Sequence, residues 1–160
     1  MFSKSCEYGI KAVIYIATQS LQNKRVKISD IVDNVGSPEA FTGKILGTLT
    51  KQGIVNSYTG PYGGFEIDLN KMESTKVGDI VSAMDGDKLY NGCGLGLSEC
   101  NSKQPCPMHD KFIVVRAQLK NMLETTTVRD LAMGLKSGKY FLFRTDCAIN
   151  NGKKKEHIGS

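Results

Sequence analysis

Three cysteines and a histidine lie close together in one short stretch of this 160-residue chain. Cys93, Cys100 and Cys106 are followed three residues later by His109, and glycines and a proline lie between them. Thiolate and imidazole ligands favour zinc, copper(I) or iron–sulfur clusters over hard cations. Because glycine allows tight backbone turns, the stretch predicts a loop that folds around an inorganic centre.

The composition is that of a globular protein and indicates a cytoplasmic location. Hydrophobic residues make up 40% of the chain and charged residues 23%. No run approaches the roughly 18 apolar residues of a membrane span, and the first residues lack the apolar centre of a secretory signal. Five cysteines, an odd number, argue against a disulfide framework. We therefore expect reduced thiols and no membrane partner.

Several residues outside the cysteine stretch have simpler interpretations. Cys6 and Cys147 are expected to be buried as small hydrophobic side chains. The net charge of +5 permits binding to a polyanion but does not require it, because the lysines at 153–155 supply much of the excess. The polar, aperiodic residues 150–160 are assigned no function.

The first part of the chain predicts a helix-turn-helix. Apolar residues recur at helical spacing over residues 8–18, and again in a second helix that begins near Ser29 and ends at Gly36. Ser37, Pro38 and Glu39 then have the form of an N-cap, a first helical position and an acidic first turn. The third helix would place its apolar stripe in the core and present its opposite face to DNA.

Two alternating segments, residues 54–59 and 65–69, flank a turn-forming loop and predict a β-hairpin. A hairpin directly after a helix-turn-helix is the wing of a winged-helix domain, whose tip can reach a DNA groove. The residues expected to contact DNA are Ser37, Thr42, Lys44, Thr48 and Lys51 in the third helix and Thr59, Tyr62 and Gly63 in the wing.

Three more helices are expected around the cysteine stretch. Thr75 would cap a short helix that ends at Gly86, and a longer amphipathic helix follows Pro107. Thr127 opens a capping box with Asp130 before a last short helix. The long helix must bury its apolar stripe, and a second copy of the chain is the simplest partner. We therefore expect a homodimer.

Seven stretches, in the same order along the chain, resemble the IscR and NsrR type of bacterial transcription regulator. They are residues 8–12, 37–41, 53–57, 60–65, 75–80, the cysteine trio and residues 127–131. The resemblance implies a dimeric winged-helix protein that binds double-stranded DNA and holds an iron–sulfur cluster on Cys93, Cys100 and Cys106. It implies a fourth ligand from either His109 or Glu7 of the partner subunit, and we expect His109.

Three features depart from the pattern of that family. The cysteines are separated by six and then five residues, whereas the IscR type usually has five and five. Thr59 stands before the wing glycine where members commonly have arginine, and Gly43 stands where IscR-like proteins carry an acidic base-reading residue. A 2Fe–2S cluster is favoured and a 4Fe–4S cluster is the alternative. A palindromic operator is expected, but its sequence is not inherited from the family.

The expected fold is mainly α with a small β-hairpin: a winged helix-turn-helix DNA-binding domain plus a long dimerisation helix. Residues 1–86 would form the DNA-binding domain and residues 87–106 the cluster-binding loop. Residues 107–135 would comprise the dimerisation helix and the short following helix, and residues 136–160 a flexible C-terminal segment.

The expected function is that of a transcriptional regulator whose operator affinity is controlled by a cluster sensing redox state, nitric oxide or iron supply. Alternatives are a regulator with a metal-free thiol switch, one with a structural zinc on three cysteines and a histidine, and a small electron-transfer protein. An enzyme is not expected, because the chain has two histidines and its glycine stretch lacks the spacing of a nucleotide loop.

Overall fold

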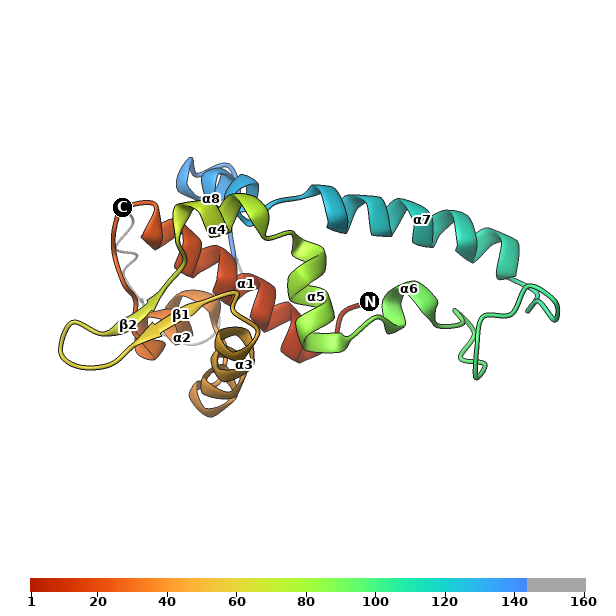
Figure 1. Ribbon diagram of the computed structural model, residues 1–160, viewed down its shortest axis with the longest axis horizontal. Helices are drawn as coiled ribbons and strands as arrows, with labels where there is room; N and C mark the ends of the chain where they lie inside the picture. Colours follow the sequence, from red (N-terminus) through yellow and green to blue (C-terminus); the bar gives the residue numbers. More distant parts are fainter. Residues whose placement is uncertain (144–160) are drawn as a thin grey trace, which may run out of the picture.

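The computed structural model describes residues 1–143, so Cys147 and the tail at 150–160 lie outside the described residues. This part of the chain is mainly α with a two-stranded antiparallel sheet, as predicted (Figure 1). The helices are α1 (Lys4–Ser20), α2 (Ile28–Val35), α3 (Glu39–Lys51), α4 (Leu69–Ser74), α5 (Val77–Asp85), α6 (Lys88–Asn91), α7 (His109–Thr125) and α8 (Val128–Lys136). Across residues 1–143, no helix combines the length and apolar character needed to cross a membrane.

The α1 helix is the centre of the main core and packs against α2, α3, α5 and α8. Its side chains Val13 and Ile16 have no exposed surface. They lie three residues apart and so face the same side of the helix. Leu46 and Leu49 of α3 pack into the same core, and each large apolar side chain buried there contributes about 1.5–3 kcal/mol. The core therefore fixes the orientation of α3.

The boundaries of several helices differ from the sequence expectation. The first helix begins earlier, at Lys4, and Ser3 caps it by accepting a hydrogen bond from the Cys6 backbone N–H. The α2 helix begins at Ile28, next to Ser29 as expected, with Lys27 as its N-cap, whereas the N-cap of α5 is Lys76 rather than Thr75. In each case the backbone N–H of the lysine donates to an aspartate three residues later, so the acid completes the cap.

The wing is confirmed but is shorter than expected. Strand β1 (Asn56–Tyr58) pairs with β2 (Gly64–Glu66), with Ser57 opposite Phe65. Residue 69 does not extend the second strand, because Leu69 begins α4, a helix that the sequence analysis missed along with α6. Short helices of this kind lack enough turns to show an apolar period.

The α8 helix packs against α1 and α4, and its Val128 and Ala132 belong to the main core. The domain boundaries expected from the sequence place this helix with the dimerisation helix instead. Thr127 caps α8 through the predicted capping box with Asp130. We call residues 1–86 together with α8 the body.

The remaining segment, residues 87–126, extends away from the body and is called the arm (Figure 1). It contains α6, the cysteine loop and α7. A second small core joins it to the body, where Leu123 of α7 packs with Cys6, Val77 and Val81. The cysteine loop therefore lies at the end of a helix whose other end is packed against α1 and α5.

Candidate metal site and nucleic-acid interface

The cysteine loop, residues 92–108, packs back onto the start of α7. Gly94 lies so close to Phe112 that a Cβ at this position would come within 2.5 Å of three ring atoms. Gly92 is similarly confined, because a Cβ there would lie 2.7 Å from the carbonyl oxygen of Lys88. The glycines of the loop thus permit close approach to the arm helices, as their spacing suggested.

The four ligands predicted between residues 93 and 109 lie as two pairs, three of them on the loop and His109 at the start of α7. Cys100 Sγ lies 3.4 Å from His109 Nδ1, and the side chain of Cys106 lies near enough to Cys93 to help lower the pKa of its thiol. His109 is buried with 8% of its surface exposed, while the three cysteines are half-buried. Among residues 1–143, no group of three or more Cys, His, Asp or Glu side chains is gathered as a metal site.

Glu7, the alternative ligand, lies on α1 and not on the loop. Its carboxylate forms an ion pair with Lys4 at 3.0 Å and remains partly exposed. Within one chain, Glu7 is therefore part of the body, and its role as a ligand across a dimer stays a prediction.

Hydrogen-bond donors surround two of the sulfur atoms. The backbone N–H groups of Leu95 and Leu97, with the Cys106 thiol, hold the pKa of the Cys93 thiol below its usual range. Arg116 donates to Cys100 Sγ over 2.9 Å. Such donors stabilise thiolates and occur around the sulfur ligands of iron–sulfur clusters. The donor set suits a soft metal centre, and binding one requires the two pairs to approach each other.

Arg116 also connects the loop to α7, a role that the sequence analysis missed. Its guanidinium donates to the carbonyl oxygens of Gly92 at 2.6 Å and Tyr90 at 3.4 Å, in addition to Cys100. These partners lie 16 to 26 residues earlier in the chain, so no local pattern reveals them.

Two residues predicted to contact DNA, one just before α3 and one within it, are buried instead. Thr42 and Ser37 are buried, with 1% and 3% of their surface exposed, and their hydroxyls bond to each other. Thr42 also donates to the Pro38 carbonyl oxygen at 2.8 Å. Because Thr42 precedes Ile45 and Leu46 by three and four residues, it shares their buried face. Ser37 is not the N-cap, since Pro38 occupies that position.

The other face of α3 remains open to a partner. Lys44 and Lys51 are exposed and Thr48 is half-buried. A Cβ at Gly43 or Gly47 would meet no atom within 4 Å, so the backbone itself is accessible there. This face can admit a phosphate backbone at short range, with two lysines beside it.

The wing places its three predicted contacts differently. Tyr62 at the tip is 89% exposed, and Thr59 is exposed as well. Gly63 is half-buried, and its N–H donates to the Gly60 carbonyl oxygen at 2.9 Å to close the turn. A side chain at Gly63 would collide with the backbone of this turn. Its role is thus to shape the tip that presents Tyr62.

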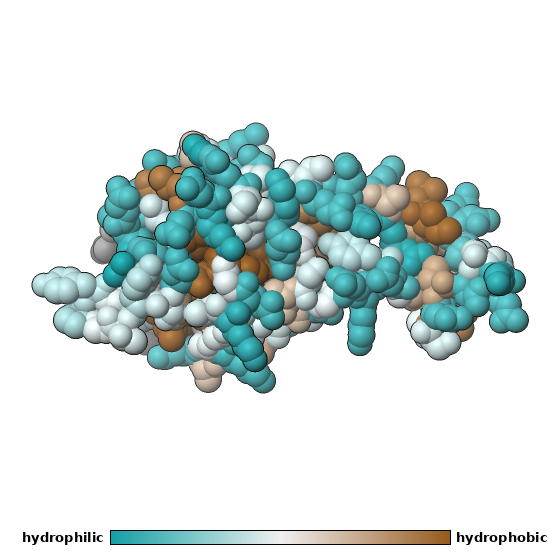
Figure 2. Space-filling model, in the orientation of Figure 1, coloured by the Kyte–Doolittle hydropathy of each residue, from teal (hydrophilic) through white to brown (hydrophobic). Residues whose placement is uncertain are grey.

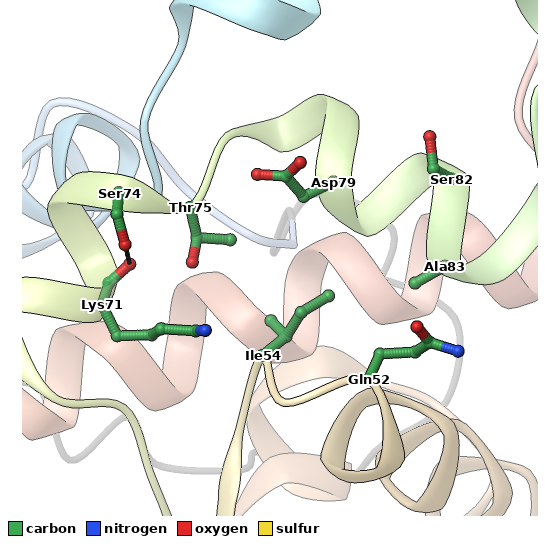
Figure 3. A pocket seen from close by; sticks show the side chains of 8 residues that line it. All are labelled: Gln52, Ile54, Lys71, Ser74, Thr75, Asp79, Ser82 and Ala83. Carbon is green, nitrogen blue, oxygen red and sulfur yellow. Dashed lines mark hydrogen bonds between the residues drawn. The ribbon is translucent and has the colours of Figure 1, made fainter.

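A groove of about 390 Å³ lies on the body between the end of α3, the entry to the wing, α4 and α5 (Figure 3). Its polar side chains largely complete the helix ends around it. Ser74 donates to the Lys71 carbonyl oxygen, Asp79 accepts from the Lys76 N–H, and Ser82 donates to Asp87. The cysteine loop, and not this groove, is therefore the candidate chemical site.

Comparison with known proteins gives one consistent result. The model of the Rrf2 family, described as an iron-dependent transcriptional regulator, matches residues 2–134. An HTH-type transcriptional regulator of Aquifex aeolicus is 28% identical over 133 residues, covering 82% of this chain and 90% of the relative. IscR of Vibrio cholerae, also an HTH-type transcriptional regulator, is 25% identical over 126 residues, covering 79% and 71%. The structure of CymR, the global cysteine regulator of B. subtilis, has the same fold with a TM-score of 0.67 and 21% identity, covering 83% and 96%.

Proposed function

The chain belongs to the Rrf2 family of transcriptional regulators, and on that premise we propose that an iron–sulfur cluster on its cysteine loop controls its affinity for operator DNA. Its relatives are regulators and not enzymes. The observation that carries the proposal is the arrangement of the loop. Cys100 lies beside His109 and Cys93 beside Cys106, and N–H groups are directed at the sulfur atoms of Cys93 and Cys100. Soft ligands in this number suit a cluster.

Cys93, Cys100, Cys106 and His109 would hold the cluster, with Glu7 of the partner subunit as the alternative to His109. A 2Fe–2S cluster is favoured over a 4Fe–4S cluster. The cluster supplies a centre that oxidants, nitric oxide or iron depletion can alter, since its one ligand that is not a thiolate is more exchangeable. The backbone N–H groups of Leu95 and Leu97 lower the pKa of the Cys93 thiol, and the guanidinium of Arg116 offers a hydrogen bond to Cys100 Sγ.

The arm would also provide the dimer contact, because it extends away from the rest of the structure (Figure 1). Three apolar side chains of α7, Val114, Val115 and Met122, are 58%, 57% and 50% exposed. Hydrophobic surface gathers at the free end of the arm (Figure 2). Exposed apolar surface of this kind is typical of a protein interface, and family regulators act as dimers. We assign this face of α7 to a second copy of the chain.

In such a dimer, two α3 helices enter successive major grooves of a palindromic operator. Lys44 and Lys51 would contact phosphates and Thr48 a base edge, with Thr59 and Tyr62 reaching DNA from the wing. Gain or loss of the cluster would move the loop that Arg116 ties to α7. The expected change in operator binding is of the order of 1–3 kcal/mol, the usual size of a coupling between two sites.

A metal-free thiol switch is the second candidate, and one observation favours it. The backbone N–H groups of Leu95 and Leu97, together with the neighbouring Cys106 side chain, lower the pKa of the Cys93 thiol. A thiol with a lowered pKa beside a second thiol is suited to forming a disulfide, in which an oxidant removes two electrons and two protons from the two thiols as the S–S bond forms. This regulator would bind DNA without iron.

The deciding experiment is anaerobic purification followed by an optical spectrum and analysis of iron, sulfide and zinc. Cys100→Ala is the test variant, and Ser98→Ala, exposed on the same loop, is the matched control. Iron and sulfide with visible absorption, present in the wild type and the control but absent from Cys100→Ala, would support the cluster. Stoichiometric zinc, or no metal in any of the three proteins, would overturn it and leave structural zinc or thiol chemistry.

A second measurement separates a regulator from an electron carrier. Wild-type protein is used to select duplexes from randomised DNA, and binding to the selected duplex is followed as a function of salt. A regulator selects a defined sequence and loses affinity steeply with salt. Failure to enrich any sequence would contradict the DNA-binding proposal whatever the metal content.

A further inference from the structure

Arg25 lies outside the hairpin, in the segment after α1, yet it contacts three parts of the wing. Its guanidinium carbon lies 3.7 Å from the centre of the Tyr58 ring. Its Nε donates to Glu66 over 2.9 Å and its Nη2 donates to the other carboxylate oxygen over 3.4 Å. Its Nη1 donates to the Tyr62 carbonyl oxygen at 3.4 Å. Arg25, Tyr58 and Glu66 together are called the wing brace.

The backbone beside Arg25 is fixed against the wing as well. Val26 exchanges two backbone hydrogen bonds with Phe65, at 3.1 and 2.8 Å, and so forms an isolated antiparallel bridge to β2. Gly64 allows this approach, since a Cβ there would lie 2.6 Å from the Val26 carbonyl oxygen and its φ is +136°. The guanidinium is thus carried to a defined place over the hairpin.

The hairpin needs such support to keep one orientation. Its strands have three residues each, and an isolated two-stranded hairpin is marginally stable in water. The wing projects from the end of the molecule opposite the arm (Figure 1). An exposed ion pair alone contributes little. A planar guanidinium that stacks on one side chain and donates two hydrogen bonds to another fixes the orientation of both side chains as well as their separation.

The tip of the wing carries no charge of its own. Residues 59–64 contain neither lysine nor arginine, and the most exposed side chain there is the Tyr62 ring. Arg25 reaches the tip through the Tyr62 carbonyl oxygen, and three of its nitrogen atoms already donate hydrogen bonds within the wing. The available contact to DNA at the tip is therefore an aromatic ring, whose usefulness depends on where the hairpin points.

We propose that Arg25 is a positioning residue that, through Glu66 and Tyr58, holds the wing in the pose from which Tyr62 contacts DNA. This inference rests on the DNA-binding function proposed above. Arg25 acts through the geometry of the hairpin and not as a phosphate contact. Glu66, although acidic and close to the DNA-facing wing, is required for binding because it anchors the guanidinium.

The test measures binding to the duplex selected by the wild-type protein, by fluorescence anisotropy over a range of salt concentrations. The variants are Arg25→Gln, Glu66→Gln, the double variant, and Tyr62→Ala alone and combined with Arg25→Gln. Each single change should weaken binding on the order of tenfold, the scale of one aromatic contact to nucleic acid. The Arg25 and Glu66 double variant should be no weaker than either single one, because both break the same brace.

Two further results are specific to positioning. Tyr62→Ala should have little additional effect in the Arg25→Gln background, and the salt dependence of Arg25→Gln should match that of wild type. Arg25→Lys should bind DNA as weakly as Arg25→Gln, since an ammonium group cannot stack on a ring and donate two parallel hydrogen bonds to a carboxylate as a guanidinium does. Without DNA, amide hydrogen exchange over residues 57–65 should accelerate in Arg25→Gln and Glu66→Gln while the thermal unfolding of the body stays unchanged.

The opposite pattern would overturn the inference. If Glu66→Gln tightens binding while Arg25→Gln reduces the salt slope by about one ion, Arg25 is a phosphate contact and Glu66 merely repels DNA. Unchanged affinity in both brace variants, with a clear loss in Lys44→Ala, would refute the brace but keep DNA binding. Loss of selection by the wild type itself would refute DNA binding.

Discussion

Replacing Gly94 by alanine tests how the cysteine loop is held on α7. The added Cβ would come within 2.5 Å of three atoms of the Phe112 ring, whereas ordinary contacts are about 3.5–4 Å. The backbone at Gly94 is not in the left-handed region, so alanine is strained by this contact alone. The loop or the ring must therefore withdraw by about 1 Å or more, at a cost of roughly 1–3 kcal/mol, which is typical of overpacking.

That cost should stay local to the arm. Phe112 belongs to neither core cluster, so the body should keep its thermal unfolding midpoint. The loop should instead detach from α7. Amide hydrogen exchange over residues 92–98 should accelerate, and incorporation of iron and sulfide should fall.

A compensating change makes the prediction specific. Phe112→Leu removes the ring atoms that the new Cβ meets, so the double variant should recover slow amide exchange and metal content. Ser98→Ala, an exposed change on the same loop, is the control for substitutions without steric effect. Wild-type exchange and loading in Gly94→Ala, or a double variant no better than the single one, would refute the packing argument.

Three other predictions concern the body. Burial raises the pKa of the Cys6 thiol to about 12 from 9.0, so the folded chain keeps a proton that the unfolded chain releases, and stability should fall as pH rises above 9. At pH 10 the loss is about 1.4 kcal/mol, and urea unfolding at pH 8 and pH 10 should show a smaller decline in Cys6→Ala than in wild type. Thr42→Val should cost about 1–3 kcal/mol, because the buried Ser37 hydroxyl loses its partner, yet leave the salt dependence of DNA binding unchanged. Lys44→Ala should leave stability nearly unchanged and reduce the salt slope of DNA binding by about one. A change of this slope in Thr42→Val would contradict the burial of Thr42 and indicate that it faces DNA.

Features with short-range causes could be predicted from the sequence. Gly36 ends α2 with φ of 73°, and Thr127 caps α8, because both signals lie within four residues of their effect. The hairpin and the grouping of the four possible ligands are likewise local. The burial of Thr42 was missed because a polar side chain can satisfy itself within its own helix turn and still face the core.

Features with long-range causes could not be predicted in this way. Arg25 reaches Glu66 across 41 residues, and Arg116 reaches Tyr90 across 26. No pattern in the sequence singles out either arginine, since periodicity describes a residue's own element and not its neighbours in space. The pairing of Cys100 with His109, and of Cys93 with Cys106, similarly depends on how the loop folds onto α7.

The junction between the arm and the body determines how a change at the loop can reach α3. Leu123 packs with Cys6 of α1 and with Val77 and Val81 of α5, and the backbone of Val77 donates to the Thr126 carbonyl oxygen at 3.0 Å. Packed interiors of this kind move as units instead of deforming continuously.

Arg116 and Leu123 are seven residues apart on α7, about 10 Å along a rigid helix. A shift of the loop at Arg116 would therefore move the whole helix and displace Leu123 with it. Leu123 packs against Cys6 of α1, and α1 packs against both α5 and α3. If the cluster controls DNA binding, the small core around Leu123 is where we expect the two to be coupled, because it packs α7 against both α1 and α5.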